Sequence, residues 1–211
     1  MTIDGNVIVS IITAIVAIFA LGLTFKQIKL SNKQHLFDKR IENYIIAIGL
    51  LDLYRTNCEH LDLDKDEPIL NIDLYFTWLS NNTYLEDITS VINNPLEKII
   101  HKKFLIKSEN MKEVGTKINF LFSDKTSKVL SDFVFSYQEL LFSMYQYKII
   151  LNKMFEKNNE KRSSIEVMQK MFDEPKYRHN LQKKYRNLIE IEKNLKENKV
   201  EEKIKKQIKL V

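Results

Sequence analysis

Basic and aromatic side chains alternate in one stretch near the end of this chain. The cations are Lys176, Arg178, Lys183, Lys184 and Arg186, and the aromatic rings between them are Tyr177 and Tyr185. Cationic side chains bind phosphates and aromatic rings stack on nucleobases, so this stretch predicts a phosphate-binding surface for nucleic acid. Two other interpretations stay open. The same cations suit the headgroups of anionic lipids, and a charge-rich helix is also typical of a solvated or partner-binding face.

Three alternating aspartates, Asp62, Asp64 and Asp66, resemble the start of a calcium-binding loop. The sixth position, which needs glycine for its sharp turn, is Glu67. The twelfth position, which needs a bidentate glutamate, is Asp73. We therefore expect a solvated acidic loop rather than a calcium site.

The sulfur and imidazole ligands that zinc prefers are scarce and scattered. Cys58 is the single cysteine, so it has no C-x-x-C partner and no internal disulfide can form. The histidines are His35, His60, His101 and His179. We expect no metal and no cofactor, and the chain lacks the glycine-rich phosphate loops and the G-x-S-x-G turn of common nucleotide-binding and hydrolase folds.

Arg55 and His60 stand in the order R-x4-H. This spacing resembles the motif of the HEPN ribonucleases, which are small helical proteins, and it implies a ribonuclease in which the two side chains position or protonate the scissile phosphate. Thr56 departs from that pattern, since a polar Asn, Asp or His usually follows the arginine. A step of five residues also turns about 140° around a helix, so the side chains diverge. In the alternative interpretation, Arg55 lays its stem along an apolar seam and His60 lies near a helix C-terminus, where a cation is favoured.

The elements that would carry these residues begin with an uncharged segment. Residues 7–25 read VIVSIITAIVAIFALGLTF, and a helix of this length spans roughly 28 Å, close to the hydrocarbon thickness of a bilayer. The hydroxyls of Ser10, Thr13 and Thr24 can bond back to the helix backbone. The preceding MTIDGN lacks the basic region of a signal peptide, and no A-x-A-like cleavage site follows. The segment therefore predicts a transmembrane helix.

Charge after this segment predicts its orientation. Residues 26–40 contain five cations, Lys26, Lys29, Lys33, Lys39 and Arg40, whereas no lysine or arginine precedes the span. Because positive flanks stay inside, we expect the N-terminus outside the cell membrane and the remainder in the cytoplasm. The same side chains suit anionic lipid headgroups, each contributing about 1 kcal/mol near the surface.

Scarce glycine (4) and proline (3) together with many straight-chain residues predict an all-α fold. The apolar seam from Phe37 to Leu51 predicts that the transmembrane helix continues without a break to about His60. Further helices are expected at 72–79, 85–92, 95–107, 111–122, 125–157 and 165–172, the longest capped by Ser123-Asp124. The predicted organisation is an extracytoplasmic terminus (1–6), a transmembrane helix (7–25), a cytoplasmic helical bundle (26–175) and a basic amphipathic helix (176–211) with a stutter near Asn198.

Two segments carry a resemblance to a wider group of proteins. They are LSNKQHLFDKRIENY at 30–44 and KINFLFSDKTSKVLSDF at 117–133. Together with the N-terminal span they resemble bacterial single-pass membrane proteins with a juxtamembrane F-[DE]-[KR]-R-x-E-x-Y stretch and a later helix that ends in FLF. Most such proteins have no assigned activity, and some are associated with phage defence as retron-type or abortive-infection effectors that damage the membrane. The resemblance implies no catalytic residues.

These observations favour a non-enzymatic, membrane-anchored interaction protein, with a phage-defence effector as its most concrete form. The expected partners are the membrane, an unidentified protein and a second copy of the chain. Ala14, Ala17 and Ala20 form a small-residue strip through which two spans could approach closely, or they simply face lipid. A membrane-tethered nucleic-acid binder and a ribonuclease that uses Arg55 and His60 are the alternatives.

Overall fold

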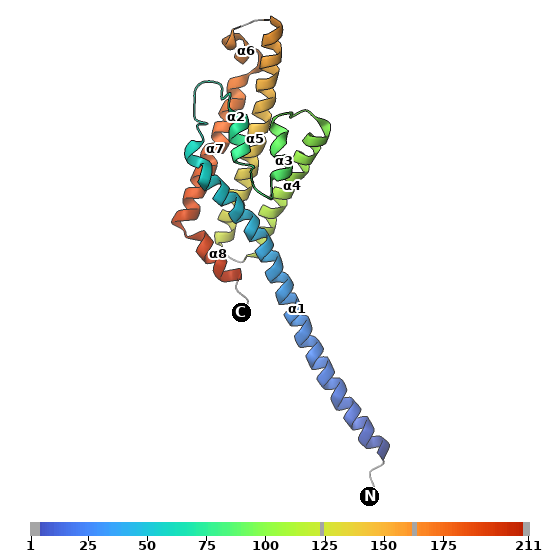
Figure 1. Cartoon of the computed structure of the whole chain (residues 1–211). Helices are drawn as coiled ribbons and strands as arrows, with labels where there is room; N and C mark the ends of the chain where they lie inside the picture. Colours follow the sequence, from blue (N-terminus) through green and yellow to red (C-terminus); the bar gives the residue numbers. More distant parts are fainter. Residues whose placement is uncertain (1–4, 123–124, 162–163, 209–211) are drawn as a thin grey trace.

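A computed structural model describes residues 5–122, 125–161 and 164–208, and these ranges hold helices and connecting loops but no strand. One helix, α1 (Gly5–Asn57), projects from a bundle as a long isolated rod (Figure 1). The all-α class and the unbroken continuation of the apolar helix into the bundle are both confirmed. The expected Ser123-Asp124 cap lies outside the described residues, as do residues 1–4 and 209–211.

The bundle is built around one central helix, α5 (Lys125–Lys161). Helices α4 (Lys98–Leu121) and α7 (Glu174–Glu197) flank it, and the inner part of α1 packs against α4, α5 and α8 (Val200–Ile208). Shorter helices complete it: α2 (Ile72–Trp78), α3 (Glu86–Thr89), α6 (Ile165–Phe172) and the 3₁₀ turns η1 (Cys58–His60) and η2 (Ser90–Ile92). The helix expected at 125–157 is therefore the centre of the bundle.

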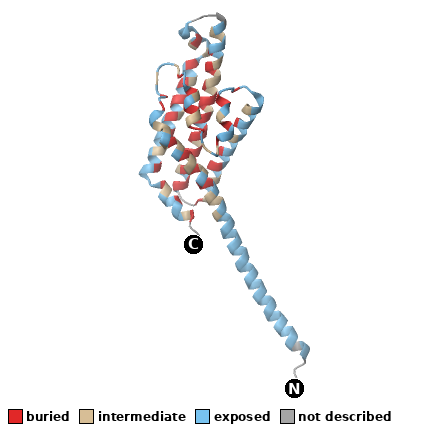
Figure 2. Cartoon of the chain, viewed as in Figure 1, coloured by how far each residue is buried: buried red, intermediate tan, exposed pale blue. Residues whose placement is uncertain are grey.

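Helix α1 consists of two physically different halves. Every side chain that the structure describes from Gly5 to Leu36 is exposed, whereas buried positions begin at Asn43 (Figure 2). Ala47, Leu50 and Leu51 are completely buried in the core. The buried face is thus rotated slightly from the expected seam, in which Phe37, Ile41 and Ile48 are only half-buried.

Small residues let the neighbouring helices approach α5 closely. Gly115 of α4 is buried, and a Cβ atom added there would lie 2.8 Å from the ring of Phe135 on α5. Beside it, Ser131 Oγ donates a hydrogen bond of 2.7 Å to the Gly115 carbonyl. Close packing of this kind explains why a serine-rich helix can occupy the centre of the domain.

Helix α4 corrects the expectation of two helices at 95–107 and 111–122. It runs unbroken, because the intervening Ser108, Glu109 and Asn110 include neither proline nor glycine and therefore permit helix. Ser108 is buried and accepts a hydrogen bond of 2.6 Å from Gln138 Nε2 of α5. This tertiary contact stabilises a helical turn at a place where the sequence predicts a loop between two helices.

The C-terminal segment forms two helices rather than one amphipathic helix. Lys199 has a left-handed backbone conformation (φ 49°) and separates α7 from α8, next to the stutter expected at Asn198. The heptad-spaced Leu181, Leu188 and Leu195 of α7 are all buried. The basic C-terminal segment is therefore an integral part of the bundle and not a separate appendage to it.

Buried tyrosines make the fold sensitive to alkali. Burial raises the pKa of Tyr44 to about 12 and raises the pKa values of Tyr54, Tyr137 and Tyr147 further above the usual 10. The folded protein then retains protons that the unfolded chain releases near pH 10. Their contribution to stability is full below pH 10 and falls by about 1.4 kcal/mol per tyrosine for each pH unit above it.

We therefore expect the bundle to unfold between pH 10 and pH 12. The measurement follows phenolate absorbance and far-ultraviolet circular dichroism in one alkaline titration, and the two signals should change together. Tyr137→Phe removes one of these retained protons, so the free energy of unfolding should fall less steeply with pH, by about 1.4 kcal/mol per pH unit. Phenolate absorbance that rises fully while the helical signal persists would contradict the prediction.

Candidate functional site

The outer half of α1 is a candidate membrane span. Its most apolar window of 18 residues has a mean hydropathy of 2.6, and none of that window is buried in the bundle. A core helix of similar composition would lie mostly inside the protein. Large apolar side chains from Ile8 to Phe25 are instead 47–71 % exposed, which suits lipid rather than water.

The polar groups of this span are satisfied within the helix. Ser10 Oγ donates to the Asn6 carbonyl, Thr13 Oγ1 to Val9 and Thr24 Oγ1 to Ala20, each at 2.8 Å. These bonds confirm the expectation that the hydroxyls bond back to their own backbone. They remove the main cost of placing a hydroxyl in hydrocarbon.

Below the bundle, α1 forms an exposed stalk of 11 residues, 26–36, about 16 Å long. It carries Lys26, Lys29 and Lys33, all exposed, in the region where the sequence predicts contact with headgroups. Lys39, one turn further, pairs with Glu42 at 3.0 Å and thereby holds the pKa of that carboxyl below its usual value. Of the five cations predicted to contact lipid headgroups, Lys26, Lys29 and Lys33 are thus the ones exposed on the isolated part of α1.

Arg40 has a structural role that its sequence position does not show. Its Nε donates to the carbonyl of Leu121 at 2.8 Å, and its Nη1 donates to the carbonyl of Gln207 at 3.1 Å. Its guanidinium also lies 5.7 Å from the centroid of the Phe122 ring. Both carbonyls belong to helix C-termini, which carry partial negative charge, so Arg40 joins the ends of α4 and α8 to α1.

Arg55 and His60 have different neighbours in the structure. Arg55 pairs with Glu192 of α7 at 2.8 Å and with Glu201 of α8 at 2.7 Å. His60 lies in η1, where its ring meets Trp78 edge to face with centroids 6.0 Å apart. The guanidinium therefore links three helices, and the ribonuclease interpretation stays a prediction.

The predicted phosphate-binding cations divide into different environments. Arg178 is buried, and Lys184 pairs with a carboxylate on α5 at 2.8 Å. Arg186 holds Asp64 with two hydrogen bonds, of 2.5 and 3.3 Å, and lowers the pKa of that carboxyl. Lys176 and Lys183 are exposed, and Lys176 lies 4.0 Å from Asp173. The five cations thus differ in burial and in ion-pair partner, and binding of phosphate or nucleic acid by them stays a prediction.

A buried polar cluster, which we term the Glu174 cluster, joins α5, α7 and the acidic loop. Glu174 is completely buried, accepts a hydrogen bond of 3.0 Å from Arg178 Nε and accepts another from the Tyr147 hydroxyl. Arg178 Nη1 and Gln182 Nε2 both donate to the Lys65 carbonyl, at 3.0 and 2.7 Å. The spacing of four residues between Glu174 and Arg178 is a signal for an ion pair, but burial of that pair is not readable from the sequence.

Basic side chains hold two carboxylates of the acidic loop. Asp62 pairs with Lys65 at 2.6 Å, while Asp64 pairs with Arg186 of α7. Across the described ranges no three His, Cys, Asp or Glu side chains are placed to hold a metal ion together.

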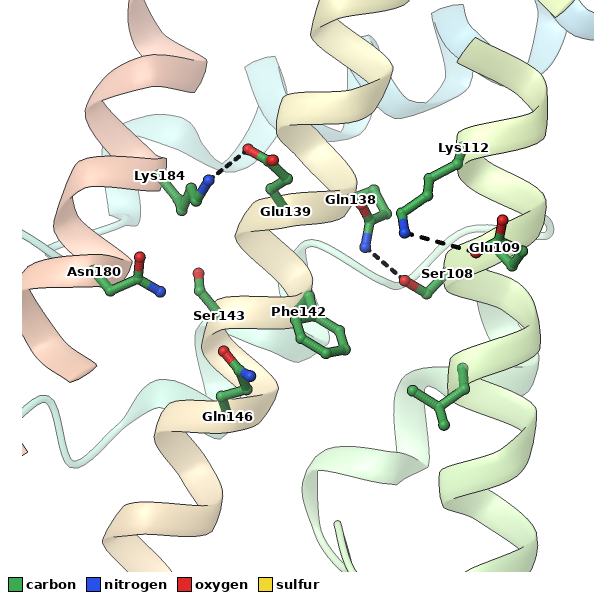
Figure 3. Close-up of a pocket in the computed structure, with 11 residues that line it drawn as sticks. Ser108, Glu109, Lys112, Gln138, Glu139, Phe142, Ser143, Gln146, Asn180 and Lys184 are labelled. Carbon is green, nitrogen blue, oxygen red and sulfur yellow. Dashed lines mark hydrogen bonds and ion pairs between the residues drawn. The ribbon is translucent and has the colours of Figure 1, made fainter. Parts of the chain in front are cut away.

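A polar groove of about 470 Å³ lies between α4, α5 and α7 (Figure 3). Its floor contains the buried Ser108, Gln138 and Ser143, and the Gln138–Ser108 bond uses one of the two donors of the glutamine amide. Phe142 supplies an apolar surface beside them. A floor of hydroxyl and amide groups is suited to hydrogen bonding with a polar segment of another molecule.

Ion pairs line the rims of this polar groove. Lys184 of α7 meets Glu139 of α5 at 2.8 Å, and Lys112 meets Glu109 on α4 at 3.6 Å (Figure 3). A second groove of about 420 Å³ continues along α5 and α7 and shares Glu139 with the first. The two grooves form a polar surface along one side of the bundle.

Comparisons with known proteins identify no relative. No protein family, no curated protein and no solved structure matches this chain. Its function must therefore be inferred from its own residues.

Proposed function

We propose that this chain is a single-pass membrane protein that holds a helical interaction domain on the cytoplasmic side of the cell membrane. The observation that supports this proposal most strongly is the continuity of α1, whose exposed outer half is apolar and whose inner half packs into the bundle core. One rigid helix thereby couples the position of the bundle directly to the bilayer. The protein acts by location and contact rather than by chemistry.

The orientation rests on the distribution of cations along α1. Lys26, Lys29 and Lys33 follow the apolar segment on the bundle side, and residues 1–6 on its other side contain no lysine or arginine. A cytoplasmic bundle and an external N-terminus follow from the positive-inside rule.

The polar groove between α4, α5 and α7 is the proposed contact surface for a partner protein. Its buried Gln138 and Ser143 lie at the floor, where a peptide backbone would find hydrogen-bonding groups in a partly desolvated setting. The ion pairs Glu139–Lys184 and Glu109–Lys112 at the rims would favour a partner segment whose charged side chains are complementary to them.

The most concrete form of this proposal is a phage-defence effector that perturbs the membrane through self-association of its spans. Its support is the resemblance of the juxtamembrane stretch at 30–44. Ala14, Ala17 and Ala20 are exposed on α1, as contact between two spans requires.

The test compares the full chain with a fragment of residues 26–211 after induction in bacteria. We expect the full chain in the membrane fraction with a cytoplasmic C-terminal reporter active, and the fragment in the soluble fraction. The effector form predicts rapid loss of membrane potential and of viability with the full chain only. An inactive reporter on a membrane-bound chain would overturn the orientation, and a toxic fragment without depolarisation would place the activity in the bundle.

A further inference from the structure

Three chain segments from different parts of the sequence meet where α1 leaves the bundle. Arg40 of α1 bonds to the last turn of α4 and to the last turn of α8, and α5 begins beside the end of α4 (Figure 1). We term this end of the bundle the basal surface and define it as residues 115–122, 125–131 and 203–208. If α1 spans a bilayer, the basal surface is the part of the bundle that faces it.

The basal surface is strongly basic. Its residues include six lysines and neither aspartate nor glutamate; the lysines are Lys117, Lys125, Lys128, Lys203, Lys205 and Lys206. All except the half-buried Lys117, which pairs with Glu113 at 2.8 Å, are exposed. The adjoining stalk adds three more lysines and again no acid.

The acidic groups nearest to this surface are few, and three of them are already paired. Glu42 of α1 binds Lys39, Glu113 of α4 binds Lys117, and Glu201 of α8 binds Arg55. Asp38, Asp132 and Glu202 are the other acids on the adjoining turns of α1, α5 and α8. Asp124 and Lys209 lie outside the described residues. The lysines therefore retain a clear excess of positive charge at this end.

Phe120 supplies an apolar anchor on the same surface. It lies near the end of α4, and at 82 % exposure it is the most exposed large apolar side chain that the structure describes. Its neighbour Phe122 is instead buried beneath Arg40. An aromatic ring exposed at the end that faces a bilayer suits the interface between headgroups and hydrocarbon, where aromatic side chains concentrate in membrane proteins.

The length of the stalk permits contact. Its 11 residues hold the basal surface about 16 Å from the hydrocarbon boundary, and the headgroup layer fills roughly 5–7 Å of that distance. The remaining separation is about one Debye length at physiological ionic strength, so the lysines lie within range of anionic lipids. A tilt of α1 of roughly 20°, which is ordinary for spans, lowers one side of the basal surface further toward the headgroups.

We propose that the basal surface docks on the anionic lipids of the bilayer that α1 spans, with its lysines at the headgroups and Phe120 inserted between them. The acidic loop with Asp62, Asp64, Asp66 and Glu67 lies in the half of the bundle away from the rod, so its carboxylates do not offset the positive charge of the basal surface (Figure 1). The bundle then stands upright, with its polar groove turned sideways. This inference rests on the proposed membrane span.

The test places tryptophan probes in the full chain, reconstituted in lipid nanodiscs whose acyl chains carry bromine as a quencher. Trp78→Phe first removes the native tryptophan, and Phe120→Trp is then introduced. In discs of phosphatidylcholine with phosphatidylglycerol, we expect quenched and blue-shifted emission from position 120. In phosphatidylcholine alone, or at high salt, the emission should be that of a ring in water. Lys203→Glu, Lys205→Glu and Lys206→Glu together should weaken docking at least about a hundredfold, because each change removes a positive charge and adds a negative one.

Two control positions separate the outcomes. Ile99→Trp lies on the same helix, α4, at 69 % exposure and about 32 Å from position 120, and it should stay unquenched. Phe19→Trp, in the apolar half of α1, should be quenched in both lipids.

An unquenched probe at position 19 would overturn the proposed span, and docking with it. A quenched probe at 19 with an unquenched probe at 120 in both lipids would overturn docking alone. Equal quenching at 99 and 120 would mean that the bundle lies on its side, which also overturns the proposal. If the triple charge reversal does not fold, as judged by circular dichroism, Lys205→Gln with Lys206→Gln should give a smaller loss of quenching in the same direction, and no loss would count against docking.

Discussion

Arg178→Met is expected to lower the free energy of unfolding by about 3–5 kcal/mol, a large part of the stability of a domain of this size. Arg178 is almost completely buried and is the cationic partner of Glu174, which is completely buried. Without Arg178 the carboxylate stays inside the bundle with no positive charge beside it. The Lys65 carbonyl of the acidic loop also loses one of its two donors. Urea denaturation followed by circular dichroism measures the effect.

Two variants make this result specific to the buried pair. Lys176→Met, on the same helix, removes an exposed cation that lies 4.0 Å from Asp173 and should cost less than about 1 kcal/mol. Glu174→Gln combined with Arg178→Met should cost less than the sum of the single changes, because the amide leaves no buried charge. An Arg178→Met variant that is no less stable than Lys176→Met would show that Glu174 does not depend on the guanidinium.

Ile15→Lys combined with Ile18→Lys is expected to remove the protein from the membrane. Both positions lie near the middle of the apolar segment, where each lysine adds about 2.5–3.5 kcal/mol to the free energy of insertion. Partitioning into the membrane should fall on the order of ten-thousandfold. The bundle should keep its thermal stability, because the exposed outer half of α1 contributes no residue to the core.

A matched pair of substitutions tests whether position or charge causes the loss. Gln27→Lys with Gln34→Lys adds the same charge to the exposed stalk and should leave the protein in the membrane fraction. Cell fractionation with a C-terminal reporter measures both variants. If the variant with lysines at 15 and 18 stays in the membrane, the apolar half of α1 is not the anchor, and the span is wrong.

Local physics explains why much of the fold is predictable. The continuous helix from the apolar segment to His60 follows from uncharged residues at 7–25 and from helical spacing after Phe37, both of which act over one or two turns. The heptad leucines of α7 correctly indicate a helix with a buried face. The local residues permit the unexpected continuity of α4 across Ser108, and a hydrogen bond from Gln138, a residue 30 positions away, stabilises it. No local signal shows that Ser108 has this partner.

The features of the candidate sites also fall into those that the sequence predicts and those that only the fold shows. The sequence by itself determines the apolar segment, the cations beside it and the helical class, because hydropathy, charge and periodicity are properties of neighbouring residues. Only the tertiary structure decides what the arginines do. Arg40 binds a carbonyl 81 residues away, Arg178 one 113 residues away and Arg186 a carboxylate 122 residues away. A long cationic side chain takes whatever acceptor the packing of helices brings within hydrogen-bond reach, and that acceptor is set by the assembled fold and not by the residues on either side.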